Sequence, residues 1–152
     1  MKQLIELIMP LMVLFSGSQV EEIENLYTTR MTSFYPEEGE ITTGSGLTPS
    51  DFGINEQGWY TYNGKIVIAT ATPYLLNNGF GLGEGVHTYN YYDELRLRID
   101  GIDYQAIVLD SCGNCMATDR IDLYVSSVVY VKDTMIEVIQ WHTTYYTWYF
   151  LD

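Results

Sequence analysis

Short runs in which hydrophobic and polar residues alternate make up most of the chain after its first two dozen positions. In the run IDLYV, Ile121, Leu123 and Val125 share one face of an extended strand. Asp122 and Tyr124 then lie on the opposite face. No run keeps the 3.6-residue period of a long helix, no segment repeats, and turn-forming residues separate the runs. This pattern predicts a mainly β fold.

Two dipeptides predict tight hairpins between neighbouring runs. Asn63-Gly64 joins WYTY to KIVIATA, and Asp100-Gly101 joins ELRLRI to IDYQAIVL. Both dipeptides favour the positive backbone angles of a type I′ turn. The run YQAIVLD is apolar at consecutive positions, which indicates a strand that is buried on both faces.

Two stretches rich in glycine and other turn-forming residues predict long surface loops, at 39–58 and 77–85. Loops of this kind often form the rim of a groove. The C-terminal runs VVYVKD and MIEVIQWHTTYYTWYFLD predict two or three further strands.

The N-terminus has the outline of a short signal peptide. Residues 4–15 are mostly apolar, follow Lys2 and end at the small residues SGS. Glu6 interrupts this run, and a dozen residues are too few to span a bilayer as an ordinary helix. We expect residues 1–18 to be a signal peptide that directs secretion. An uncleaved membrane anchor or a buried helix is the alternative, and 19–28 is a linker.

Length and charge limit the classes of partner. A chain of 152 residues suffices for one domain with a real core, and its fourteen tyrosines suit strands. Seven basic against twenty acidic residues give a net charge of −13, which repels a phosphate backbone. We therefore expect no nucleic-acid partner. The charge also disfavours highly anionic polymers but permits neutral or peptide-bearing glycans.

The stretch YQAIVLDSCGNCMATDRIDLYVS carries the candidate chemistry. An apolar strand brings Asp110 into a turn that contains glycine and cysteine, and the next strand brings Asp122. Two carboxylates at neighbouring buried strands suggest a site. In the structural alternative, Asp110 caps the turn with its side chain, and Asp122 pairs with Arg120 or Lys65 at the surface.

The two cysteines form a C-x-x-C motif with several readings. A redox role for Cys112 and Cys115 requires a thioredoxin-like βαβ context, which the sequence lacks. A zinc site requires two more ligands, and the two histidines, His87 and His142, are far apart in sequence. We therefore expect no metal and no cofactor. The thiols stay reduced if the chain is cytosolic.

Several aromatic side chains are candidates for stacking on sugar rings, because an aromatic face offers apolar contact and, in tyrosine and tryptophan, a polar edge. Packing in the core is the alternative for each of them. The candidates are Trp59, Tyr60, Tyr62, Tyr74, Tyr89, Tyr91 and Tyr92.

The order of these motifs resembles the double-psi β-barrel family of expansins, barwin-like proteins, rare lipoprotein A and the 3D-domain lytic transglycosylases. Members share an apolar strand, an Asp in the turn after it, and a second Asp followed by Leu or Phe. The twelve-residue spacing here is one residue longer than usual. RMTSFYP with TGSG resembles the opening strand, and VIATAT with YYDELRLRIDG resembles the middle of the barrel. The resemblance covers residues 29–127.

The resemblance implies an all-β (mainly) fold, a six-stranded double-psi β-barrel with additional C-terminal strands that complete or cover it, within a domain at 29–152. It implies cleavage of peptidoglycan without water by a single acid/base residue. Asp122 is our candidate, because a rigid and partly desolvated position suits a proton donor. Asp110 would orient it or stay ionised, the usual division of roles between paired carboxylates.

The same resemblance places Thr32 and Tyr35 in the groove, and we add Tyr74 and Tyr124 as further substrate-binding candidates. Cysteines occur at this place in expansins, which implies a Cys112–Cys115 disulfide that holds the turn. The expected partner is peptidoglycan or a related cell-wall polysaccharide.

Three other functions fit the same motifs. A hydrolase with one acid and one base would have similar carboxylates. A non-catalytic, expansin-like module would bind or loosen wall polysaccharide. A structural or virion-associated protein, encoded by a phage, would use the barrel for docking, and its N-terminal segment would not be an export signal.

Overall fold

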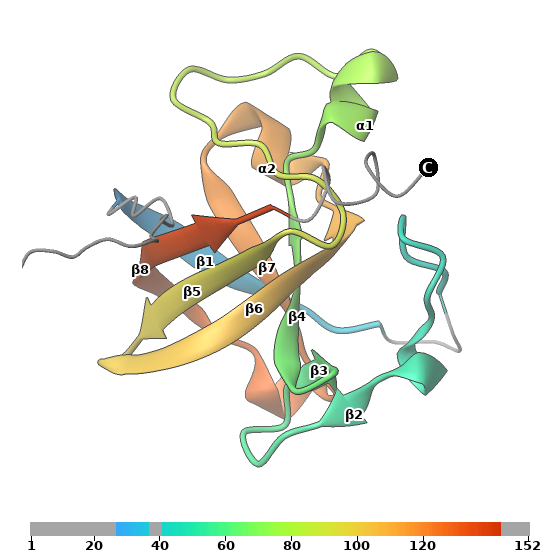
Figure 1. Cartoon of the computed structure of the whole chain (residues 1–152), viewed down its shortest axis with the longest axis vertical. Helices are drawn as coiled ribbons and strands as arrows, with labels where there is room; N and C mark the ends of the chain where they lie inside the picture. Colours follow the sequence, from blue (N-terminus) through green and yellow to red (C-terminus); the bar gives the residue numbers. More distant parts are fainter. Residues whose placement is uncertain (1–26, 37–40, 144–152) are drawn as a thin grey trace, which may run out of the picture.

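The computed structural model describes residues 27–36 and 41–143 (Figure 1). The expected signal peptide or anchor and the first eight positions of the linker lie outside these residues. In the described part of the chain, no helix is long and apolar enough to cross a membrane. The strands are β1 (Tyr27–Phe34), β2 (Gly53–Ile54), β3 (Tyr60–Tyr62), β4 (Lys65–Thr70), β5 (Glu94–Ile99), β6 (Ile102–Ser111), β7 (Arg120–Tyr124) and β8 (Asp133–His142). The helical segments are α1 (Pro73–Asn77), α2 (Asn114–Ala117), and the 3₁₀ turns η1 (Pro49–Asp51) and η2 (Val128–Tyr130).

Six strands close into a barrel in the order β4-β6-β5-β8-β1-β7, with the β4–β7 pairing as the closure. The pairs β1–β7 and β4–β6 are parallel, and the other four are antiparallel. Exchanging β1 with β6, β4 with β7 and β5 with β8 maps every pair onto a pair of the same direction. The prediction of a mainly β, six-stranded barrel is confirmed, and this two-fold relation is compatible with the double-psi arrangement.

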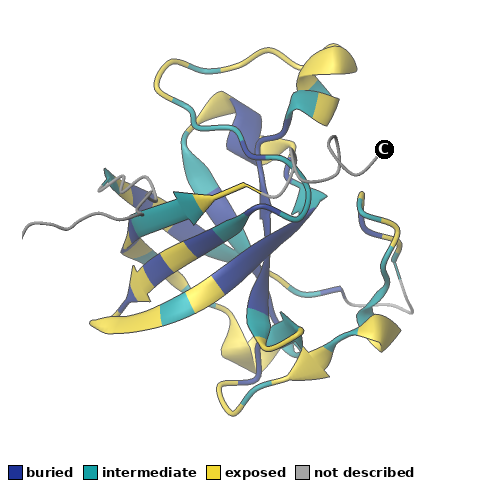
Figure 2. Ribbon diagram, viewed as in Figure 1, coloured by how far each residue is buried: buried dark blue, intermediate teal, exposed yellow. Residues whose placement is uncertain are grey.

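Alternation of side chains separates the inside of the barrel from its outer face (Figure 2). Ile121 and Leu123 of β7 and Val125, directly after it, are buried in the barrel core, as the sequence pattern predicts. Tyr124, on the opposite face, belongs to a second apolar cluster outside the barrel, under α2. The remaining buried members of this second cluster are Val67, Ala69, Ala71, Ile107, Leu109, Cys112, Cys115 and Met116.

Both predicted hairpins are present. Asn63 and Gly64 have φ angles of 51° and 81° and join β3 to β4. Asp100 and Gly101, at 52° and 82°, join β5 to β6. Positive φ at both central positions is the requirement of a type I′ turn, so local turn chemistry sets the register of both hairpins.

The C-terminal and loop regions differ from the sequence pattern in two places. VVYVKD does not form a separate strand: Val128 begins the turn η2, because the Ser127 hydroxyl accepts a hydrogen bond from the Val129 amide at 3.4 Å. The following β8 completes the barrel between β5 and β1. The two strands outside the barrel are β2, which lies in the predicted loop 39–58, and β3, which lies in the predicted strand WYTY. Residues 144–152 lie outside the described part.

Candidate functional site

The barrel brings Asp110 and Asp122 to the two sides of one strand. Asp110 of β6 and Asp122 of β7 are both Cα partners of Ala69 in β4. Since neighbouring strands lie about 4.8 Å apart, the two Cα atoms are separated by roughly 10 Å. Residues that are twelve positions apart in the chain thus become neighbours through a third strand.

A β-bulge determines the face on which Asp110 lies. Ile68 pairs with Val108, and the next residue, Ala69, pairs with Asp110, so Leu109 is an extra residue in β6. A bulge of this kind re-aims the side chains that follow it, and bulges are common beside active sites. As a result Asp110 shares the outer face with Ala69, where strict alternation would have directed it into the barrel.

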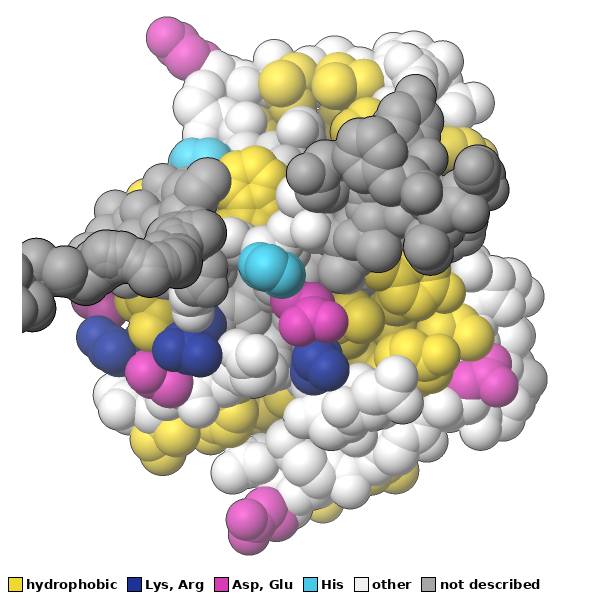
Figure 3. Space-filling view, viewed as in Figure 1, with side chains coloured by type: hydrophobic (Ala, Val, Ile, Leu, Met, Phe, Trp, Pro, Cys, Tyr) yellow, Lys and Arg dark blue, Asp and Glu magenta, His cyan; other side chains and the backbone are white. Residues whose placement is uncertain are grey.

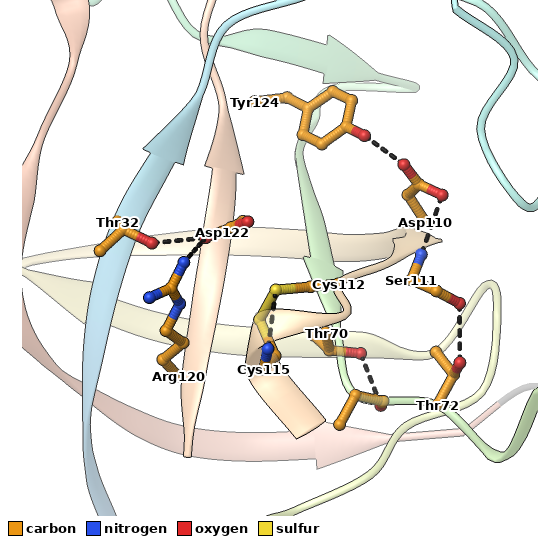
Figure 4. The surroundings of a disulfide bond; sticks show 11 residues. Thr32, Thr70, Thr72, Asp110, Ser111, Cys112, Cys115, Arg120, Asp122 and Tyr124 are labelled. Carbon is orange, nitrogen blue, oxygen red and sulfur yellow. Dashed lines mark hydrogen bonds and ion pairs between the residues drawn. A yellow bond between two sulfur atoms is a disulfide. The ribbon is translucent and has the colours of Figure 1, made fainter. Parts of the chain in front are cut away.

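Three donors hold the Asp110 carboxylate, and Figure 4 shows two of them, Ser111 and Tyr124. The amides of Gly44 and Ser111 donate to Oδ1 at 2.8 and 2.9 Å, and the Tyr124 hydroxyl donates to Oδ2. Gly44 comes from a distant loop, where a Cβ would lie 2.0 Å from the Tyr91 hydroxyl oxygen. Asp110 therefore fastens this loop to the barrel.

Asp122 has a different environment. The Thr32 hydroxyl donates to its Oδ1, and Arg120 Nη2 lies 3.6 Å from the same oxygen. Its side chain is 15% exposed. Among the residues that the structure describes, no donor binds Oδ2. Within the described residues, the hydrogen bond and the ion pair of Asp122 both involve Oδ1.

Tyr124 is hydrogen-bonded to Asp110 and interacts electrostatically with Asp122. Burial raises the pKa of Tyr124 above its ordinary value, and the charge of Asp110, the hydrogen bond to it and the charge of Asp122 raise it further. The phenol therefore keeps its proton at neutral pH and acts as a donor.

A chain of hydroxyl groups continues from Asp110 toward the α1 loop. Ser111 Oγ lies 2.6 Å from the Tyr91 hydroxyl and 2.7 Å from Thr72 Oγ1. Burial raises the pKa of Tyr91, and its hydrogen bond with Ser111 opposes that rise. Tyr74, on α1, is 56% exposed and lies close enough to Tyr91 to interact with it electrostatically.

Four residues were expected to bind substrate, and the structure brings two of them to the carboxylates. Thr32 and Tyr124 bond to them directly. Tyr35 is half-buried and packs against the barrel core. Tyr74 is exposed beyond the hydroxyl chain, and within the described residues neither Tyr35 nor Tyr74 bonds to either carboxylate.

Sequence reasoning missed three members of the site: Gly44, Thr72 and Ser111. Gly44 lies in the stretch TTGSG, which the sequence marks only as a loop. Ser111 directly follows Asp110, so its position was a usable signal, and Thr72 precedes Pro73 as the N-cap of α1, which predicts a helix start and not a place in the site.

The Cys112–Cys115 disulfide is confirmed. Both cysteines are buried, and the Cys115 amide donates to Cys112 Sγ at 3.0 Å. The two sulfur atoms and a carboxylate oxygen of Asp122 all lie within 4.8 Å of one another. The disulfide therefore supports the turn after Asp110 and also borders Asp122.

No family model, curated protein or solved structure matches this chain. The contacts themselves also agree with part of the structural alternative. Asp110 does cap a turn, and Asp122 does approach Arg120. Lys65 instead approaches Glu94, at 3.8 Å.

A small hollow lies on a different part of the barrel, over β5, β6 and β8. Its volume is about 180 Å³. Figure 3 shows acidic, basic and histidine side chains side by side on the face toward the viewer, so this face carries charges of both signs. The hollow is lined by Glu94, Leu95, Arg96, Gln105, Gln140 and His142. None of these residues belongs to the carboxylate site.

Proposed function

We propose that this chain cleaves the glycan strands of peptidoglycan as a lytic transglycosylase, with Asp122 as its acid/base. One observation carries the proposal: in the part of the chain that the structure describes, both polar partners of Asp122 contact Oδ1. A general acid must be within hydrogen-bond reach of the atom that it protonates. Oδ2, which no donor among the described residues binds, lies on a rigid strand and meets that requirement.

The reaction needs one group that first donates a proton and then accepts one. Asp122 in its acid form donates a proton to the glycosidic oxygen as the bond to the anomeric carbon breaks. The resulting carboxylate then accepts the proton of the muramic 6-hydroxyl, whose oxygen attacks the anomeric carbon and closes an anhydro ring. No water is consumed.

The neighbouring groups have supporting roles in this proposal. Asp110 fixes the loop that carries Gly44 and stays bonded to Tyr124, which keeps this second carboxylate in place near the reacting one. Exposed Tyr74 offers an aromatic face for a sugar ring at the edge of the site.

The expected setting is the cell surface. The net charge of −13 suits uncharged glycan strands better than anionic polymers. The disulfide suits an oxidising compartment, in line with export or anchorage through the N-terminal segment.

The test is incubation of the purified full chain with peptidoglycan sacculi and mass spectrometry of the released material. Wild type should release anhydro-muropeptides, and Asp122→Asn should release none while it keeps the wild-type circular dichroism spectrum. Asp103→Asn, an equal change at an exposed carboxylate near the other end of β6, should behave as wild type. Activity retained in a folded Asp122→Asn variant would refute the assignment.

The second candidate is an expansin-like module that binds wall polysaccharide without cleaving it. The Arg120 contact of Asp122 and the capping bonds of Asp110 favour it, because purely structural carboxylates make such contacts. Sedimentation of the wild type with sacculi, without any released product, would support this function in place of catalysis.

A further inference from the structure

Three potential metal ligands converge beside the catalytic candidate. The sulfur atoms of Cys112 and Cys115 and a carboxylate oxygen of Asp122 lie within 4.8 Å of one another. Sequence reasoning set a zinc site aside because the C-x-x-C motif lacked further ligands. The fold supplies one from β7, a strand that the cysteines do not belong to.

We infer that reduction of the disulfide converts this cluster into a binding site for a thiophilic divalent cation of the Zn²⁺ class. Two thiolates, one carboxylate and one water form the open, four-coordinate set that zinc accepts in proteins. Thiolate ligands select Zn²⁺ over Mg²⁺ or Ca²⁺. Asp122 is 15% exposed, which gives the water ligand a route from solvent.

The local backbone already suits two sulfur ligands. The cysteine Cα atoms are 5.1 Å apart on one turn, and the Cys115 amide donates to Cys112 Sγ, a bond that stabilises a thiolate. With Zn–S bonds of about 2.3 Å in a tetrahedron, the sulfurs must move to roughly 3.8 Å apart. Cys115 is carried by the four-residue helix α2, and the Cys112 amide donates a hydrogen bond to the Thr70 carbonyl at 2.8 Å, so the separation requires a shift of α2.

Charge is balanced at the site. Two thiolates, the Asp122 carboxylate and the Arg120 guanidinium together carry two net negative charges, which a divalent cation neutralises. A buried cluster is stable only when its charges are compensated in this way.

The steps leading to binding also balance. An external dithiol attacks the disulfide by two exchange reactions, which break the protein S–S bond, leave both cysteines as thiols and close a disulfide in the reductant. The cation then displaces the two thiol protons to solvent as two sulfur–metal bonds form.

The test uses the full chain, reduced with a dithiol, freed of reductant under nitrogen and titrated with Co²⁺ as a spectroscopic substitute for Zn²⁺. The sequence has two cysteines, so a thiolate-to-cobalt charge-transfer band reports on this site alone. The reduced chain should saturate at one ion per chain and release Co²⁺ to added Zn²⁺, and the oxidised chain should give no band. Absence of the band in the reduced chain overturns the inference.

The variant Asp122→Asn tests whether the ion is bound by three protein ligands or by the two cysteines alone. Losing even an outer-shell partner of a metal site costs 10- to 100-fold in affinity, so Asp122→Asn should weaken Co²⁺ binding by at least about tenfold. Asp103→Asn is the matched control and should bind as wild type. Equal affinity in Asp122→Asn and wild type overturns the assignment of Asp122 as ligand.

Reduction itself can unfold the chain, and near-ultraviolet circular dichroism detects this before titration. In that case Zn²⁺ should restore the wild-type spectrum, because binding to a site that only the folded chain forms drives refolding. Failure of Zn²⁺ to restore it overturns the inference.

Discussion

Replacing Tyr124 by phenylalanine removes one oxygen atom and tests how the site is held together. The ring should stay in place, since it packs in the outer apolar cluster and against Phe34, with 5.1 Å between the ring centroids. The loss is therefore confined to the hydrogen bond that the hydroxyl donates to Asp110.

The size of the effect follows from the charge and exposure of the acceptor. A hydrogen bond to a charged group contributes about 1.5 to 3 kcal/mol to the free energy of unfolding. The Asp110 carboxylate is only partly buried and keeps its bonds to Gly44 and Ser111, so water can replace part of the loss. We expect Tyr124→Phe to lower the free energy of unfolding by about 1 to 2 kcal/mol. That corresponds to a Tm lower by roughly 3 to 10 °C.

Urea denaturation followed by tryptophan fluorescence measures this change. Tyr74→Phe is the matched control, because Tyr74 is 56% exposed, and its free energy of unfolding should stay within about 0.5 kcal/mol of wild type. A double-mutant cycle with Asp110→Ala should give a coupling energy of about 1 kcal/mol or more. Equal effects of Tyr124→Phe and Tyr74→Phe, or strict additivity in the cycle, would refute this account of the site.

Three further predictions concern pH, the loop and the disulfide. The pKa of Tyr124 is raised above its ordinary value of 10.0 in the fold, so its contribution to stability is complete below pH 10 and is lost as pH rises beyond it. In urea denaturation at increasing pH above 10, the free energy of unfolding should fall less steeply for Tyr124→Phe than for wild type. An equally steep fall in both would contradict the prediction. Gly44→Ala would bring a Cβ to 2.0 Å from the Tyr91 hydroxyl oxygen, so thermal melts should show a loss of about 1 to 3 kcal/mol, and a wild-type Tm would be the contrary result. The double variant Cys112→Ser/Cys115→Ser should have a free energy of unfolding about 2 kcal/mol lower in urea denaturation, because the loop that the disulfide closes is very short. A variant that is already unfolded without urea would show that the disulfide does more than close this loop.

Local chemistry made much of the barrel predictable. The Asn63-Gly64 and Asp100-Gly101 turns and the alternation in β7 depend on neighbouring residues, and they formed as the sequence indicates. The disulfide is also local, since its cysteines are three positions apart.

The rest of the site depends on contacts that no local pattern encodes. The bulge at Leu109 lies in a run that is apolar at every position, so alternation gives no signal of the extra residue. Gly44 reaches Asp110 across 66 positions of sequence, and the approach of Asp122 to the cysteines depends on how α2 packs against β7. The turn η2 replaced a predicted strand because one serine caps it.

The parallel pairing of β1 with β7 has a consequence for the order of assembly. Thr32 and Asp122 are separated by 90 positions, and the barrel also needs β8, which is later still. Pairings between such distant segments form slowly, because the entropy lost on closing the long intervening loop opposes them. A chain synthesised only as far as β7 therefore has no closed barrel, and whatever the site does can begin only after β8 has emerged.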